Sequence, residues 1–185
     1  DANALRDVAR SKKLPPTYFA RFNIVLEKPE DLFSYTKSGS SIYRGFLNLI
    51  HFASDNGLKD WSNSGAITEQ RLEDHHIFPK GYIDSKVNFD TSTDEAIMLA
   101  ESVVNRALMP KLTNIKVGKQ SPYKYLNELY DKNQNLDISL KSHYVPPDLR
   151  HNESYSTQLL DFLSGRASTV FDIIKKQVVE PLNTI

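Results

Sequence analysis

Two adjacent histidines mark the stretch that decides the fold, Leu72–Lys80, which reads Leu-Glu-Asp-His-His-Ile-Phe-Pro-Lys. The whole chain has only five histidines, so a pair followed by two apolar residues and a proline is a distinct local pattern. Neighbouring side chains on a strand point to opposite faces. At the end of a strand, His75 can therefore face a metal ion while His76 faces a substrate. Taken alone, the pair has a plainer explanation, because adjacent histidines also occur by chance on protein surfaces.

A second polar pattern follows in Ser102–Lys119. Asn105 opens a short apolar run there, and Asn114 stands beside lysines further on. The chain continues as Gln120–Leu126, which reads Gln-Ser-Pro-Tyr-Lys-Tyr-Leu. This order resembles the HNH nucleases, also called His-Me finger or ββα-metal nucleases. In that family a His-Ile/Val-x-Pro box precedes an Asn at the start of the second strand and an Asn or His on a short helix.

More specifically, the chain resembles the C-terminal nuclease domain of GmrSD-like, modification-dependent restriction proteins. That group shows a His-His-Ile-Phe-Pro box, an Ile/Val-x-Asn-Arg/Lys-x-Leu run and an Asn-x-x-x-Gly/Asn-Lys-x-Pro-x-x-Tyr-Leu segment. The likeness is strong from about Tyr43 to Leu126. It is weaker over Phe162–Lys176, and residues before Tyr43 add nothing to it.

The resemblance implies a role for each polar residue of the two patterns. In the family, the catalytic His lies three positions before the proline of the box, and the residue before that His binds metal. The resemblance therefore makes His76 the general base and His75 a metal ligand. Asn114 matches the last metal ligand, on the helix. Asn105 matches the catalytic-site Asn that braces the loop between the two strands. Asp74 is an alternative metal ligand, or an acceptor for the Nδ1–H of His75.

The expected cofactor is a divalent metal ion. The chain has no Cys, which rules out thiolate ligands and disulfides and leaves His, Asn, Asp and Glu as donors. Oxygen donors suit Mg²⁺, the first expectation. His75 stands where many relatives have Asp. An imidazole is a softer ligand than a carboxylate, so Mn²⁺, Ni²⁺ or Zn²⁺ could compete with Mg²⁺ for the site. Four basic side chains are candidates for holding phosphate: Lys116, Lys119, Lys80 and Arg106.

Charge is unevenly distributed although the formal net charge is zero. Ser102–Asn127 contains no Asp or Glu but five basic residues, whereas Glu69–Glu101 holds eight acids. A basic face beside a metal site is what a phosphodiester backbone requires. Without the motifs, a solvated lysine face explains the same run equally well.

The length of 185 residues suits one compact domain, with the ββα core at about residues 70–126. We expect a mostly α (α+β) fold, in which a helical shell surrounds a small ββα-metal core with a two-stranded antiparallel sheet. No apolar run reaches transmembrane length, so we expect no membrane partner and a cytoplasmic protein. The chain lacks an initiator Met and a signal pattern, so we expect a fragment of a longer protein or a processed one.

Spacing and capping residues predict the local structure. The His box forms the first strand and Val103–Met109 the second. Residues 81–92 are a loop, and residues 131–149 are polar and turn-rich, with an extended loop at 143–147. Helices are expected in the following ranges: 1–14, 17–22, 30–35, 42–52, 93–99, 113–117, 122–130, 155–165 and 166–179. Trp61, the only tryptophan, is expected to pack in the core rather than to stack on a base.

The expected function is a metal-dependent DNA endonuclease that nicks or cuts DNA as the effector of a bacterial restriction or anti-phage defence protein. An N-terminal NTPase-like domain that senses the modification or regulates the nuclease is the expected partner. Two alternatives stay open: a catalytically silent DNA-binding module on the same scaffold, and a nuclease toxin with an immunity partner. RNA also stays open as a substrate.

Overall fold

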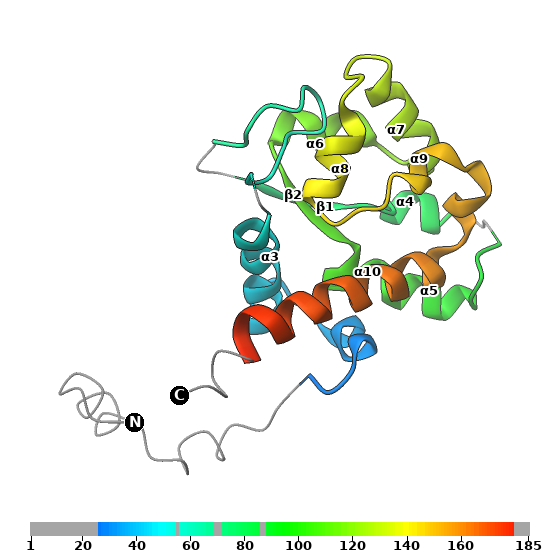
Figure 1. The fold of residues 1–185 in the computed structure, drawn as a ribbon. Coiled ribbons are helices and arrows are strands. Elements are labelled where there is room, and N and C mark those ends of the chain that lie inside the picture. Colours follow the sequence, from blue (N-terminus) through cyan, green and yellow to red (C-terminus); the bar gives the residue numbers. More distant parts are fainter. Residues whose placement is uncertain (1–25, 55, 69–71, 86–87, 180–185) are drawn as a thin grey trace, which may run out of the picture.

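The computed structural model of the chain describes residues 26–54, 56–68, 72–85 and 88–179 (Figure 1). Its elements in chain order are η1 (Pro29–Ser34), α3 (Ser41–Ala53), β1 (Glu73–His76), α4 (Lys80–Ile83), α5 (Thr93–Ala100), η2 (Val103–Asn105), β2 (Arg106–Met109), α6 (Lys111–Val117), α7 (Pro122–Tyr130), α8 (Leu136–Ser142), α9 (Asp148–His151), η3 (Glu153–Thr157), α10 (Leu159–Ile174) and the π-helical turn η4 (Lys175–Val179). The described part is mostly helical with one two-stranded sheet, which confirms the expected class at that level.

The sheet lies among the helices. β1 and β2 run antiparallel, with Glu73 opposite Met109 and His76 opposite Arg106. In Figure 1, α6, α7 and α8 lie on one side of this sheet and α10 crosses below it beside α5. α10 is the central packing element, because it contacts η1, η2, α3 and α5. The sheet is therefore held between elements that come from distant parts of the chain.

Serine caps fix the starts of three helices. Ser40, Ser92 and Ser121 each accept a hydrogen bond from the backbone N–H three residues further on. Such caps satisfy N–H groups that have no partner within the helix. Pro122 follows Ser121 at the first helical position, where its fixed φ costs nothing. The sequence offered Ser92 or Thr93 as the cap of α5 and Ser121 as the cap of α7, and the structure selects Ser92 and Ser121.

Three sequence-based assignments are wrong in part. The second strand begins at Arg106, because Val103–Asn105 form the 3₁₀ turn η2, capped by the Ser102 hydroxyl. The expected loop 81–92 starts with the helical turn α4, directly after Pro79. The stretch 131–149, expected to be turn-rich, contains α8, whose residues Leu136 and Leu140 are buried at helical spacing.

The C-terminal part differs from the expectation in where its helices begin and end. Residues 153–157 form the 3₁₀ helix η3, and α10 then runs without a break through Gly165 and Arg166. One face of α10 is apolar and buried, from Leu159 to Phe171, so there is no reason for a break. The helices expected at 1–14 and 17–22 lie outside the described residues.

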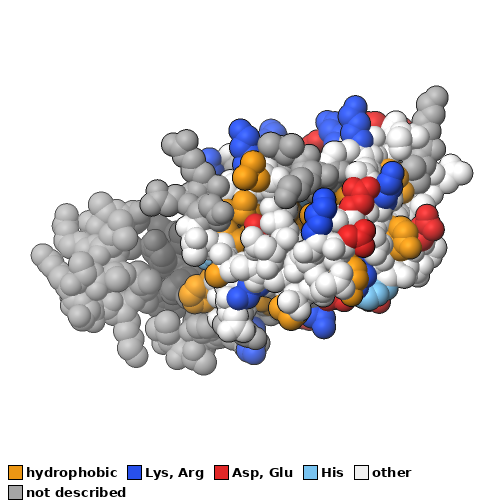
Figure 2. Space-filling model, turned by 90° about the horizontal axis from the view of Figure 1, so that it is seen from above, with side chains coloured by type: hydrophobic (Ala, Val, Ile, Leu, Met, Phe, Trp, Pro, Cys, Tyr) orange, Lys and Arg blue, Asp and Glu red, His pale blue; other side chains and the backbone are white. Residues whose placement is uncertain are grey.

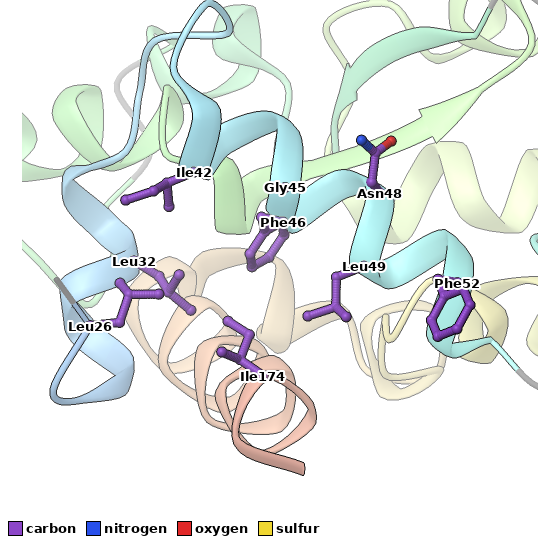
Figure 3. A pocket seen from close by; sticks show the side chains of 9 residues that line it. All are labelled: Leu26, Leu32, Ile42, Gly45, Phe46, Asn48, Leu49, Phe52 and Ile174. Atoms are coloured by element: carbon purple, nitrogen blue, oxygen red, sulfur yellow. The ribbon is translucent and has the colours of Figure 1, made fainter. Parts of the chain in front are cut away.

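An apolar groove of about 370 Å³ lies between η1, α3 and α10 (Figure 3). Leu32 and Phe46 form part of its lining, and Phe52 at one end is 77% exposed. None of its lining residues belongs to the His box.

Over the ranges that the structure describes, no helix combines the length and apolar character needed to cross a bilayer.

Candidate active site

Strand β1 presents its side chains to two different surroundings. Glu73 and His75 lie toward α6, where both are linked to Asn114. Asp74 and His76 lie on the other side, where both are close to Arg106 of β2. This is the alternation that a strand requires. The two histidines therefore have separate partners, although they are neighbours in the chain.

His75 and Asn114 are in direct contact. The Nδ1 of His75 lies 2.6 Å from the Oδ1 of Asn114, and the Asn114 Nδ2 donates to Glu73 Oε2 at 2.8 Å. A carboxylate only accepts, so Glu73 fixes the orientation of the carboxamide, and Asn114 Oδ1 must accept from His75 Nδ1–H. Burial lowers the pKa of His75 to about 4, although its hydrogen bond to Asn114 opposes the shift. At pH 7 His75 is neutral, the form that binds metal.

The two histidines and Asn114 line one polar pocket of about 240 Å³. Its other lining residues are Asp74, Pro79, Lys80, Gly81 and Gly118. The pocket thus collects His75, His76, Asp74, Asn114 and Lys80, five of the residues that the sequence pattern singled out.

His76 is held between Arg106 and Glu101. The Arg106 Nη1 donates to His76 Nδ1 at 3.2 Å, and Glu101 Oε2 lies 3.5 Å from His76 Nε2. Arginine only donates, so the lone pair of the ring is on Nδ1 and the proton is on Nε2, on the side of Glu101. Burial and then the charge of Arg106 lower the pKa of His76, and Glu101 partly offsets them.

Asp74 is tied to a tyrosine. The hydroxyl of Tyr43 on α3 donates to Asp74 Oδ2. Asp74 Oδ1 is buried without a hydrogen-bond partner in the described residues and lies 3.6 Å from Arg106 Nη1. Burial, followed by the hydrogen bond to Asp74, raises the pKa of Tyr43. Asp74 therefore lines the pocket with one oxygen that has an ion pair to Arg106 but no hydrogen bond within the described part of the chain, and it does not contact His75 Nδ1, which is bonded to Asn114.

Asn105 is not in the pocket. It is fully buried, its Oδ1 accepts from Phe78 N–H at 2.8 Å, and its Nδ2 donates to Phe78 O and Ala100 O at 3.0 and 2.9 Å. Its backbone carbonyl also accepts from Ile77 N–H at 2.9 Å. Asn105 therefore holds the chain that follows β1 and acts on the pocket only through that backbone.

The four candidate phosphate ligands have different surroundings. Lys80 lines the pocket and pairs with Glu101 at 3.1 Å, whereas Arg106 is buried and pairs with Glu101 Oε2 at 2.5 Å. Lys119 is exposed, and its stem lies against Gly81, where an added Cβ would meet Lys119 Cγ at 2.6 Å. Lys116 belongs to α6, and its side chain is outside the described part. On the face in Figure 2, Lys and Arg are interspersed with Asp and Glu rather than forming one basic surface.

The donors suit a divalent ion, although their number is small. In the described ranges no three His, Asp or Glu side chains come together to hold a metal ion, so the set depends on the carboxamide of Asn114. His75 Nδ1 and Asn114 Oδ1 would hold the ion, with Asp74 as the alternative donor. Two donors of one ion sit about 3 Å apart, slightly more than the 2.6 Å seen here. Metal binding therefore requires the Nδ1 proton to leave and the two atoms to separate by a few tenths of an ångström.

Glu73, Glu101 and Tyr43 are the residues that the sequence analysis missed as parts of the site. A signal existed for Glu73, because it stands two positions before His75 and so shares its face of the strand. No local signal pointed to Tyr43 or Glu101. Tyr43 reaches the site from α3, and Glu101 reaches it from the end of α5. Gly118 follows α6 with φ +60° and ψ −135°, a conformation suited to glycine but different from left-handed helical geometry.

Comparisons with known proteins add one relative. No protein-family model matches the chain, and no solved structure matches it. The chain is 34% identical over 123 residues to the protein MJ0686 of the archaeon Methanocaldococcus jannaschii, which carries the description "uncharacterized". The match covers 60% of this chain and 20% of MJ0686. The chain thus spans about a fifth of the length of the curated relative that it matches.

Proposed function

We propose that the chain is a metal-dependent DNA endonuclease of the HNH type, with its ββα-metal core at about residues 70–126. The observation that carries the proposal is that His75, His76 and Asn114 line the same pocket, with His75 Nδ1 and Asn114 Oδ1 2.6 Å apart. Binding of DNA alone gives no reason to place a neutral imidazole and an oriented carboxamide together. A metal-assisted hydrolysis uses both.

The residues would divide the work of phosphodiester hydrolysis. His75 and Asn114 would hold the divalent ion, expected to be Mg²⁺, and Glu73 fixes the orientation of the Asn114 carboxamide. When bound, such an ion stabilises charge on a non-bridging phosphate oxygen and on the departing 3′ oxygen. Lys80 and Lys119 are placed to attract the phosphate.

His76 is the proposed general base. Its Nδ1 lone pair takes the proton of the attacking water, and its Nε2–H stays on the side of Glu101. The carboxylate then stabilises the imidazolium that forms. Because Arg106 donates to Nδ1 in this structure, the guanidinium must first turn away, and a bound phosphate is a suitable new acceptor for it.

The same contact favours a second candidate function. An Arg106 that stays on His76 Nδ1 leaves the base without a free lone pair, which suits a catalytically silent DNA-binding module. The two candidates agree on DNA as the partner and differ only in cleavage.

We further propose that this nuclease is the cytoplasmic effector part of a larger restriction or anti-phage defence protein. The resemblance of the His box to modification-dependent restriction proteins supports this setting. So does the length of MJ0686, of which the chain covers only a fifth. An NTPase-like sensor domain would control the nuclease in such a protein.

A cleavage assay tests the proposal. The purified chain should nick plasmid DNA with Mg²⁺ or Mn²⁺, and EDTA should stop it. His76→Ala should abolish nicking with an unchanged circular dichroism spectrum. His51→Ala, at an exposed position on α3, is the matched control and should cut like the wild type. Full activity of His76→Ala would refute its role as base, and DNA binding without cleavage under every metal would favour the silent module.

A further inference from the structure

The ring of Trp61 joins two histidine rings, those of His75 and His143, in one buried cluster. The Trp61 ring contacts the rings of His75 and His143 edge-on, with centroid distances of 5.8 and 5.6 Å. All three side chains are buried, at 0%, 3% and 0% exposure. Each ring carries a nitrogen without a hydrogen-bond partner in the described residues: Trp61 Nε1, His75 Nε2 and His143 Nδ1. Unpaired buried polar atoms are costly, and three in adjoining rings need an explanation.

The proton on each ring follows from its other contacts. His143 Nε2 lies 3.0 Å from the carbonyl of Lys59, which only accepts, so Nε2 carries the proton and Nδ1 is an acceptor. His75 Nδ1 donates to Asn114, so its Nε2 is also an acceptor. The indole of Trp61 can only donate. The cluster therefore presents one donor and two acceptors.

We propose that a single buried water molecule links Trp61, His75 and His143, and that Trp61 and His143 position His75 through it. A water molecule accepts from Trp61 Nε1–H and donates its two protons to His75 Nε2 and His143 Nδ1. Buried waters typically make about three hydrogen bonds of this kind. The donors and acceptors of the cluster are then all satisfied.

The same water accommodates the change that metal binding imposes on His75. Nδ1 can bind an ion only without its proton, so the ring proton must sit on Nε2, and a ligating histidine needs an acceptor there. The water then accepts from both Trp61 Nε1–H and His75 Nε2–H and donates to His143 Nδ1. It makes three hydrogen bonds in either state. This second role depends on the proposed function, whereas the water site itself does not.

The segment that carries Trp61 is firmly anchored, as a positioning role requires. Asp60 next to it accepts from Thr113 Oγ1 at 2.8 Å, which ties the segment to α6 beside Asn114. The Trp61 carbonyl accepts from Asn133 Nδ2 at 3.1 Å. Tyr125 packs parallel to Trp61 and edge-on to His75, but its hydroxyl donates elsewhere, to Ile77 O. Tyr125 thus shares the packing of the cluster without its unpaired atoms.

A high-resolution crystal structure of the metal-free chain tests the water site. We expect one water within about 3.2 Å of Trp61 Nε1, His75 Nε2 and His143 Nδ1. An empty space, a direct hydrogen bond between two of the rings, or a metal ion at that place would overturn the proposal.

Metal titrations test the positioning role. Trp61 is the only tryptophan, so its fluorescence reports Mn²⁺ binding at His75 without any DNA. His143→Phe should weaken Mn²⁺ binding about 10- to 100-fold. His143→Gln, which keeps a donor for Lys59 O and an acceptor, should recover part of the loss and serves if the Phe variant does not fold. Tyr125→Phe should bind Mn²⁺ like the wild type.

The ring proton gives a signature that loss of packing alone would not produce. ¹⁵N NMR should show the His75 proton on Nδ1 in the metal-free chain and on Nε2 with diamagnetic Zn²⁺. Unchanged Mn²⁺ affinity in both His143 variants would refute the positioning role. If the wild type neither binds Mn²⁺ nor cuts DNA, the proposed function fails, while the crystallographic result still decides the water site.

Discussion

The carboxamide of Asn105 holds both backbone polar groups of Phe78, accepting from its N–H at 2.8 Å and donating to its carbonyl at 3.0 Å. This double contact fixes the chain at the point where β1 ends and the pocket begins. Since Asn105 itself is the last residue before β2, its side chain ties the start of β2 to the segment that follows β1.

Replacing Asn105 should cost stability. Asn105→Ala leaves three buried backbone groups, on Phe78 and Ala100, without partners, and we expect the free energy of unfolding to fall by about 3–5 kcal/mol. Urea denaturation measures this loss in the free energy of unfolding. Asn127→Ala, which loses two hydrogen bonds at a half-buried position, should cost only about 1 kcal/mol. Equal losses in the two variants would contradict the bracing role.

Removing the charge of Glu101 should slow cleavage and shift its pH dependence. Glu101→Gln replaces the charged acceptor near His76 Nε2–H with a neutral amide, which stabilises the imidazolium less. We therefore expect turnover to drop about 10- to 100-fold. Glu101 raises the pKa of His76, so its loss should move the acidic limb of the rate profile to lower pH. A profile that moves toward higher pH would show that Glu101 does not act on His76.

Asn114 should determine metal affinity. Asn114→Ala removes an oxygen donor 2.6 Å from His75 Nδ1, so Mn²⁺ binding measured by calorimetry should weaken at least about tenfold, or about 1.4 kcal/mol. Glu73→Gln still offers Asn114 Nδ2 an acceptor and should have a smaller effect. If Glu73→Gln weakens binding more than Asn114→Ala, the carboxylate of Glu73 is itself a ligand.

Stability should decline below about pH 6.5. Burial lowers the pKa of His143 to about 3 and that of His75 to about 4, from 6.5 in the unfolded chain. Between these values the unfolded chain binds protons that the folded chain does not. The contribution of the two histidines to the free energy of unfolding is thus fully present above pH 6.5. It falls with decreasing pH, by up to about 1.4 kcal/mol per pH unit for each histidine.

Urea denaturation at pH 7, 6 and 5 measures this slope. His143→Gln should be less stable than the wild type at pH 7 but lose its stability more gradually as the pH falls. An identical slope in the variant would mean that His143 is not a source of the pH dependence.

Gly81 should control the position of Lys119. In Gly81→Ala the new Cβ would meet Lys119 Cγ at 2.6 Å, so the lysine stem must move. We expect weaker DNA binding, measured by fluorescence anisotropy at low salt, with little change in melting temperature. Lys119→Ala should weaken binding to a similar degree, and the double variant should be no worse than either. Additive losses would show that the two residues act separately.

The sequence by itself determined the local elements with strong signals. Serine caps and apolar spacing located α3, α5 and α7, and the alternation of β1 separated the surroundings of His75 from those of His76. Asn114 was singled out because its place after the box matched a family pattern. These signals succeed because caps and periodicity act over a few residues, and neighbouring residues carry them.

Only the tertiary structure decided the partners that reach the site from distant elements. Tyr43 and Glu101 approach from α3 and the end of α5, respectively. Trp61 contacts both His75 and His143, although Trp61 and His143 are 82 positions apart in the chain. The start of β2 also depended on tertiary contacts, because Asn105 is bonded to Phe78 and Ala100 rather than to a strand. Packing brings such residues together without leaving a spacing in the chain, so no local pattern could predict them.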